Sequence, residues 1–153
     1  MKQLGGWQVL MADTSGLLAA FDQTDPLYEK AAWALNRAGL VVMSPLVLAE
    51  LDHLSRSRHP RILHHDAVRM MLDLQKRLVD KRLVIPAIEA VTLERAQLLR
   101  QANAGLDLDL ADATTVVLAW EWSTYDVLTL DQNDFRALRL PNAGYFRVLP
   151  ADL

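Results

Sequence analysis

Short apolar runs alternate with longer amphipathic stretches along most of this chain. The runs that favour β-strands are residues 7–12, 40–43, 82–85, 126–130 and 145–149. The stretches with helical spacing are residues 17–21, 26–38, 45–55, 63–79, 88–102 and 110–120. Strands separated by helices are typical of βαβ units, so the pattern predicts an α/β protein with a mainly parallel sheet and helices on both of its faces. We expect one domain, residues 1–153, because no repeat or linker interrupts the pattern.

Local start and stop signals support several of these helices. Asp25 is followed by Pro26, and Ser44 is followed by Pro45. A capping residue with proline after it is a typical helix start. Gly39 follows the first of these helices and is expected to end it.

Composition narrows the chemistry that the protein can perform. The 153 residues are 52% hydrophobic and 23% charged, as in ordinary globular proteins. No cysteine is present, which excludes disulfides, thiolate metal ligands and cysteine nucleophiles. The first residues suit neither a signal peptide nor a membrane span, so we expect a cytoplasmic protein that does not bind membranes. A net charge of −3 argues against a general nucleic-acid coat protein.

Positive charge is concentrated in residues 56–69, which hold four arginines and three histidines against one aspartate. This segment is either a solvated loop and helix start or a patch that contacts phosphates. The candidate phosphate-contacting residues are Arg56, Arg58, Arg61 and Arg69. The histidines have no convincing zinc spacing; they are His53, His59, His64 and His65.

Two acids stand where predicted strands end. Asp13 follows the first strand and Asp131 follows the fourth. If these strands are adjacent, both carboxylates lie at the edge where open α/β sheets bind ligands. Asp13 has an alternative role as a helix N-cap. Asp131 and Asp134 are alternatively turn and cap residues of a short helix through Phe135, and we prefer that interpretation for Asp134.

Two further acids lie within predicted helices. Glu50 falls on a largely apolar stripe, where a carboxylate needs a cation or hydrogen bonds; a structural ion pair with an arginine is the alternative. Asp112 is favoured by the helix dipole if Asp109 is the cap. However, Asp107 also crowds this helix start, and three carboxylates repel one another unless a cation intervenes.

Together the four acids, Asp13, Glu50, Asp112 and Asp131, suit hard oxygen-ligand chemistry with Mg²⁺ or Mn²⁺. Such a site lowers the pKa of water and stabilises the attacking and leaving oxygens of a phosphodiester. The sequence therefore predicts metal-dependent phosphoryl hydrolysis. A serine nucleophile is not supported, because no G-x-S-x-G elbow exists.

At these residues the chain resembles the PIN-domain family, and most of all the ribonuclease toxins of VapBC-type toxin–antitoxin modules. The matching segments occur in the family's order and span nearly the whole chain. They are ADTSGLLA with Asp13, SPLVLAELDHL with Glu50, DLADATTVVLAW with Asp112, and LTLDQNDF with Asp131.

The resemblance implies a three-layer α/β/α sandwich and an endoribonuclease that uses Mg²⁺ or Mn²⁺. Asp13 and Asp112 would be the direct metal ligands, and Glu50 and Asp131 would complete the catalytic acids. The residues implied to hydrogen-bond to these acids are Thr14, Ser15 and Thr129. The implied substrate is RNA, often a tRNA or a ribosomal RNA site, and the implied partners are a cognate antitoxin and a second copy of the chain.

Two other functions compete with this one. A non-catalytic PIN-like module would bind a partner protein through its apolar helices. A phosphatase or receiver domain would also place acids at strand ends. Against these last two, Met11 occupies the first position of the phosphatase D-x-D pattern, and no lysine follows Lys81 to serve a receiver domain.

Overall fold

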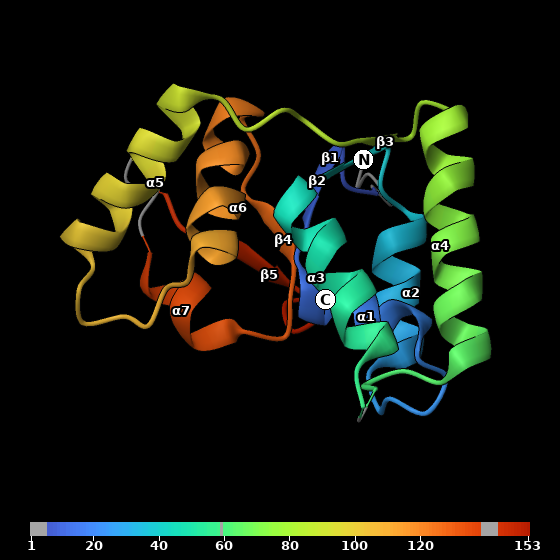
Figure 1. The fold of residues 1–153 in the computed structure, drawn as a ribbon. Coiled ribbons are helices and arrows are strands. Elements are labelled where there is room, and N and C mark those ends of the chain that lie inside the picture. The colour runs from blue at the N-terminus through green and yellow to red at the C-terminus, as the bar shows by residue number, and fades with distance from the viewer. Residues whose placement is uncertain (1–5, 59, 139–143) are drawn as a thin grey trace.

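A central sheet organises the computed structural model, which describes residues 6–58, 60–138 and 144–153. The strands are β1 Val9–Ala12, β2 Leu40–Met43, β3 Leu83–Val84, β4 Asp126–Leu128 and β5 Arg147–Leu149. They are all parallel and lie in the order β3-β2-β1-β4-β5 (Figure 1). The predicted mainly parallel sheet is confirmed.

Helices cover both faces of the sheet (Figure 1). On one side lie α1 Thr14–Phe21, α2 Tyr28–Asn36, α3 Pro45–Arg56 and α4 His64–Val79. On the other side lie α5 Ala90–Ala102, α6 Leu110–Glu121 and α7 Gln132–Ala137. This is the predicted α/β/α sandwich. None of the described helices is long and apolar enough to cross a membrane.

The strands supply both cores because successive side chains point to opposite faces. Leu10 and Ala12 face the core with α1 to α4, whereas Met11 faces the core with α5 to α7. All three are fully buried. The near-continuous apolar runs in the sequence are therefore those of strands covered on both faces.

Strand order reverses at β1, and this reversal determines where a ligand can bind. The chain builds β2 and β3 on one side of β1, crosses over the sheet, and places β4 on the other side (Figure 1). Ala12 of β1 is paired with Leu128 of β4, so these two strands end side by side. The carboxyl ends of strands at such a switch point form the usual binding crevice of open α/β sheets.

Several element bounds differ from the predicted ones for local reasons. The fourth strand ends at Leu128 rather than at residue 130, because the backbone N–H of Leu130 donates to the Ser15 hydroxyl at 2.9 Å instead of to a strand. Helix α2 begins at Tyr28, because Asp25 accepts from the Leu27 N–H and forms a separate turn. Helix α1 starts earlier than predicted, directly after Asp13.

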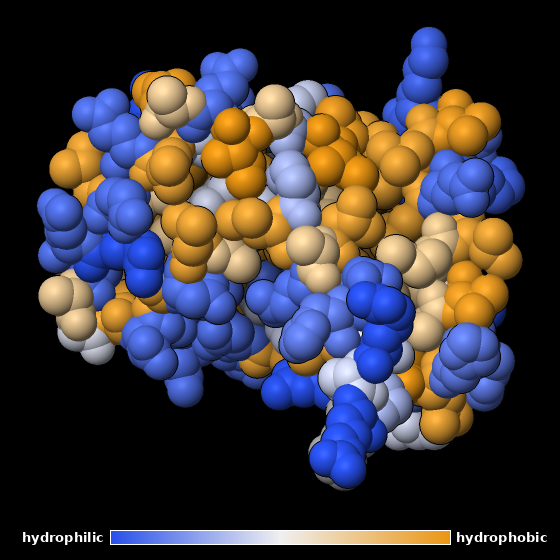
Figure 2. Space-filling view, viewed as in Figure 1, coloured by the Kyte–Doolittle hydropathy of each residue, from blue (hydrophilic) through white to orange (hydrophobic). Residues whose placement is uncertain are grey.

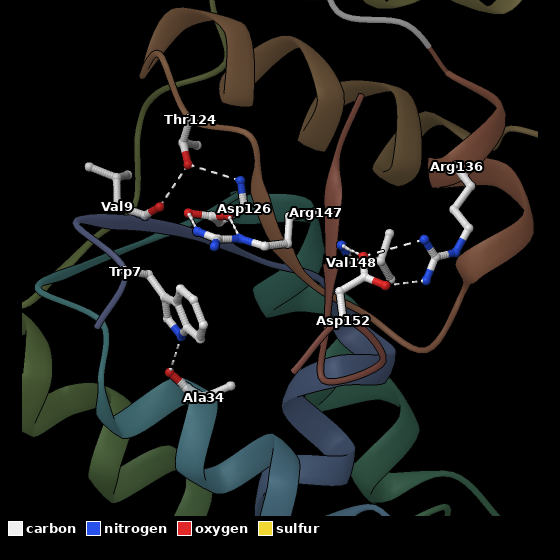
Figure 3. A network of polar contacts seen from close by, with 9 residues as sticks. All are labelled: Trp7, Val9, Ala34, Thr124, Asp126, Arg136, Arg147, Val148 and Asp152. Carbon is white, nitrogen blue, oxygen red and sulfur yellow. Dashed lines mark hydrogen bonds and ion pairs between the residues drawn. The ribbon is translucent and has the colours of Figure 1, made fainter. Parts of the chain in front are cut away.

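A polar network fixes the opposite, amino end of the sheet (Figure 3). Arg147 on β5 pairs with Asp126 on β4 and stacks over the Trp7 ring, whose centroid is 4.5 Å away. The Trp7 indole N–H donates to the Ala34 carbonyl of α2 at 2.9 Å. Thr124 donates to the Val9 carbonyl at 2.7 Å. These bonds hold β1, β4 and β5 together away from the carboxyl edge, which is left for chemistry.

Candidate active site

Asp13 stands at the carboxyl end of β1 and is 5% exposed. It occupies the N-cap position of α1, yet its side chain makes no capping hydrogen bond. Instead, its Oδ2 accepts a hydrogen bond from the Thr129 hydroxyl at 2.7 Å. The side chain is therefore directed across the sheet edge toward the β4 side, and capping does not account for this acid.

The Thr129 hydroxyl is the centre of a short hydrogen-bond network at this edge. Its Oγ1 donates to Asp13, accepts from the Asp131 N–H at 3.0 Å, and lies 3.2 Å from the Ser15 hydroxyl. The Ser15 hydroxyl also accepts from the Leu130 N–H. Among the described residues, the Ser15 hydroxyl bonds to Thr129 and to the Leu130 backbone and forms no hydrogen bond with a carboxylate. The Thr14 hydroxyl is buried and has no hydrogen-bond partner among the described residues.

Gly16 allows α1 to approach β4 closely enough for this network. A Cβ atom at Gly16 would lie 2.3 Å from the Leu128 carbonyl oxygen, far inside van der Waals contact. No residue with a side chain fits there without a backbone shift. The sequence ADTSG thus contains Asp13, the Ser15 hydroxyl that bonds to Thr129, and Gly16, which lets α1 lie against β4.

Asp112 comes to the site on the first turn of α6. The Asp109 side chain caps this helix by accepting from the Asp112 N–H at 2.8 Å, as the sequence predicts. Burial raises the pKa of Asp112 to about 8, and repulsion by neighbouring carboxylates adds to the rise. These neighbours include Asp13 and Asp131, so carboxylates from three separate segments meet at one place.

Asp134 joins Asp112 and Asp131 in a compact group. One carboxylate oxygen from each of the three lies within 4.8 Å of the others, a spacing suited to a shared metal ion. Burial, and then repulsion by Asp131, raises the pKa of Asp134. The sequence favours a turn or cap role for Asp134, and Asp131 does accept from the Asp134 N–H at 3.4 Å. The sequence does hold a signal that Asp134 can share a metal ion with Asp131. The two acids are three residues apart, which places them on one side of the first turn of α7.

Glu50 lies on α3, which begins directly after β2. Ser44 caps this helix by accepting from the Leu46 N–H at 3.2 Å. Glu50 is half-buried, and no salt bridge to it is formed in the part of the chain that the structure describes. Its charge repels that of Asp13. The alternative of a structural ion pair with a described arginine therefore finds no support.

Asp13 is the most buried of these acids, and its pKa reflects that. Burial raises the pKa of Asp13 to about 6 from its ordinary value of 3.8. Hydrogen bonds from Thr129 and from the Thr14 backbone oppose the rise. Repulsion by Glu50 and Asp131 adds to it. Asp13 thus repels each of the other three predicted acids, and a cation would relieve this repulsion.

Hydrophilic side chains gather on the face where these elements meet (Figure 2). In that view they cover the lower middle of the molecule, where Figure 1 draws α7 and the start of α6 beside α3. Apolar residues dominate the upper middle of the same face. Asp112, Asp131 and Asp134 are partly exposed, so a charged substrate can reach them.

The four predicted RNA-contacting arginines differ in exposure and in their contacts within the protein. Arg69 donates to the Phe21 carbonyl at 2.6 Å and pairs with the fully buried Asp66 at 3.2 Å, so it joins α4 to the end of α1. Arg56 is exposed and pairs with Asp52 within its own helix. The other two, Arg58 and Arg61, are exposed and form no salt bridge with any described residue. His59 lies outside the described residues.

Comparisons with known proteins show the family of this chain. The family model described as the PIN domain matches residues 10–139. Ribonuclease VapC26 of Mycobacterium tuberculosis is 32% identical over 142 residues, which cover 92% of this chain and all of that protein.

Two solved structures share the fold. The crystal structure of VapC20 from Mycobacterium tuberculosis, described as a sarcin–ricin loop cleaving toxin, superposes with a TM-score of 0.64 at 20% identity, covering 81% of this chain and 91% of that one. VapBC2 from Rickettsia felis, solved bound to a DNA fragment from its promoter, gives a TM-score of 0.59 at 19% identity, covering 92% and 98%. At these identities the likeness concerns the fold. With a family model across most of its length and a full-length relative at 32% identity, this chain belongs to the PIN-domain family and is of the VapC type.

Proposed function

We propose that this protein is a metal-dependent endoribonuclease of the VapC type, formed by residues 1–153 as one domain. The observation that carries the proposal is the convergence of acids from four segments on the carboxyl edge of the sheet at its switch point. Relatedness to Ribonuclease VapC26 supports RNA as the substrate. The catalytic acids of the proposal are Asp13, Glu50, Asp112 and Asp131.

The chemistry of the site fits a divalent cation. Burial and the neighbouring carboxylates oppose a charge on Asp112 and raise its pKa, and a cation at the same place would remove that opposition. Carboxylate oxygens are the ligands that Mg²⁺ and Mn²⁺ prefer. Asp112 and Asp13 would hold the ion: Asp112 lies in one compact group with Asp131 and Asp134, and Asp13 lies near enough to repel its charge.

The chain's own groups divide the remaining work. Thr129 fixes the Asp13 carboxylate by donating a hydrogen bond to its Oδ2. Glu50 and Asp131 would orient water and accept its proton. When bound, a divalent ion supplies an activated water and compensates the charge that develops on the phosphodiester.

RNA binding would fall to local arginines, because the chain is acidic overall. Arg58 and Arg61 are exposed at the connection between α3 and α4 and have no described acidic partner, so they are the strongest candidates. Arg56 would exchange Asp52 for a phosphate. The contacts of Arg69 within the protein make it the weakest of the four.

Likeness to the VapC type also supports two partners. We propose that a cognate antitoxin holds the enzyme inactive and that two copies of the chain form a homodimer. Co-purification with a co-expressed cognate antitoxin, followed by a cleavage assay before and after its removal, tests the first. Light scattering of the isolated chain tests the second.

Cleavage of a tRNA pool and of ribosomal RNA, with Mg²⁺ or Mn²⁺ and with EDTA, tests the central proposal. Asp13→Asn is expected to abolish cleavage, because it removes a ligand charge and leaves a side chain of the same shape. Asp80→Asn is the matched control, since Asp80 is exposed and pairs with Lys76 away from the acids. Cleavage by Asp13→Asn at the parental rate would refute the site assignment.

Melting curves separate this function from that of a non-catalytic binding module. A ligand that binds only the folded state raises its melting temperature, so Mn²⁺ is expected to stabilise the protein. Unchanged melting of the parental protein across a Mn²⁺ titration, together with no cleavage, would favour the module.

A further inference from the structure

Helix α1 and the loop after β4 are joined by hydrogen bonds that cross the site, and Ser15 lies at their centre. Ser15 is on the first turn of α1, two residues after Asp13, and its partners are 114 and 115 residues away along the chain. The loop that it contacts runs from Thr129 into Asp131. One hydroxyl therefore connects the segments that carry two of the acids.

The direction of every hydrogen bond in this network can be assigned. The backbone N–H groups of Leu130 and Asp131 can only donate, to Ser15 and Thr129 respectively. Thr129 donates its single proton to Asp13. The contact between the two hydroxyls, at 3.2 Å, must then take its proton from Ser15. Ser15 accepts one bond and donates one, and no proton is left over for a competing arrangement.

From this geometry we infer that Ser15 is a positioning residue that sets the placement of Asp13 relative to Asp131, acting through Thr129 and the Leu130 backbone. The inference rests on the proposed function, because the distance between these acids matters only if they serve one ion. Removing the hydroxyl leaves the Leu130 N–H without its acceptor and releases Thr129 to rotate away from Asp13. Gly16 supports the same contact by letting α1 lie against β4.

Mn²⁺ titration of a Ser15 series, followed by melting temperature, tests this role. Ser15→Ala is expected to weaken Mn²⁺ binding by about tenfold or more, since outer-shell partners of metal ligands typically contribute about 10–100-fold to affinity. Ser15→Cys introduces a weaker hydrogen-bonding group of similar size, so its Mn²⁺ affinity should lie between those of Ser15→Ala and the parental protein. It also provides a second variant if the alanine protein does not fold. Ser15→Thr should restore binding. Ser55→Ala is the matched control, because it removes a helix serine that bonds only within α3.

Two further measurements separate positioning from a general effect on folding. In the metal-free protein, the Leu130 and Asp131 amide protons should exchange faster in Ser15→Ala than in Ser55→Ala. With RNA, kcat should fall with little change in KM.

Parental Mn²⁺ affinity in Ser15→Ala, or a lowered melting temperature without any change in that affinity, would overturn the inference and leave the proposed function standing. Absence of both Mn²⁺ binding and cleavage in the parental protein would instead overturn the proposed function, and this inference with it.

Discussion

Replacing Asp13 with asparagine should make the metal-free protein more stable while removing its activity. The reason is that, in the metal-free parental protein, the buried Asp13 carboxylate carries a negative charge that no cation balances. Asparagine keeps the size of the side chain and an oxygen that can accept from Thr129, so the hydrogen bond from Thr129 survives. Only the charge is lost.

The magnitude follows from the pKa of Asp13, which burial raises from 3.8 to about 6. Because the folded state has the higher pKa, it binds more protons than the unfolded state, and stability falls as the pH rises through this window. Each pKa unit corresponds to about 1.4 kcal/mol, so ionised Asp13 lowers the free energy of unfolding by about 3 kcal/mol at pH 8. At pH 5, by the same linkage, Asp13 lowers the free energy of unfolding by about 1.5 kcal/mol.

Urea unfolding in EDTA at pH 5 and pH 8 measures both values. Asp13→Asn should exceed the parental protein in unfolding free energy at both pH values, and by more at pH 8. Added Mn²⁺ should then stabilise the parental protein alone, by about 2.7 kcal/mol at one hundred times its dissociation constant. Asp80→Asn should show neither effect. A variant that is no more stable than the parent at pH 8, or a gain that does not grow with pH, would refute the reasoning.

Three further substitutions test the scaffold and the substrate contacts. Gly16→Ala should lower the unfolding free energy by about 1–3 kcal/mol in urea, because its Cβ meets a β4 carbonyl at 2.3 Å, whereas Gly105→Ala, with nothing within 4 Å, should cause no loss. Ser44→Ala should cost about 1 kcal/mol in the same assay through loss of the α3 cap; an unchanged midpoint would count against that cap. Replacing Arg58 and Arg61 with glutamine should raise KM for RNA and reduce the salt dependence of binding by roughly one ion per lost phosphate contact, with kcat unchanged.

Much of the fold follows from local sequence. The alternation of apolar runs and amphipathic stretches predicts the strands and helices, because both depend on neighbours within a few residues. Ser44 and Asp109 act as the caps that their positions predict. The acids Asp13 and Asp131 were found because each follows an apolar run, and that is also a local property.

The composition of the site was decided by tertiary structure. Sequence spacing could not show that β1 and β4 are neighbours, yet this pairing brings Asp13 to Thr129 across 116 residues. Sequence spacing also could not show that the Asp134 carboxylate lies beside that of Asp112, or that Arg69 forms a salt bridge with Asp66. The sequence by itself determined which residues stand at the ends of strands and helices, since short-range periodicity and capping govern these. Strand order and loop course, which depend on contacts between distant segments, decided which of those residues meet.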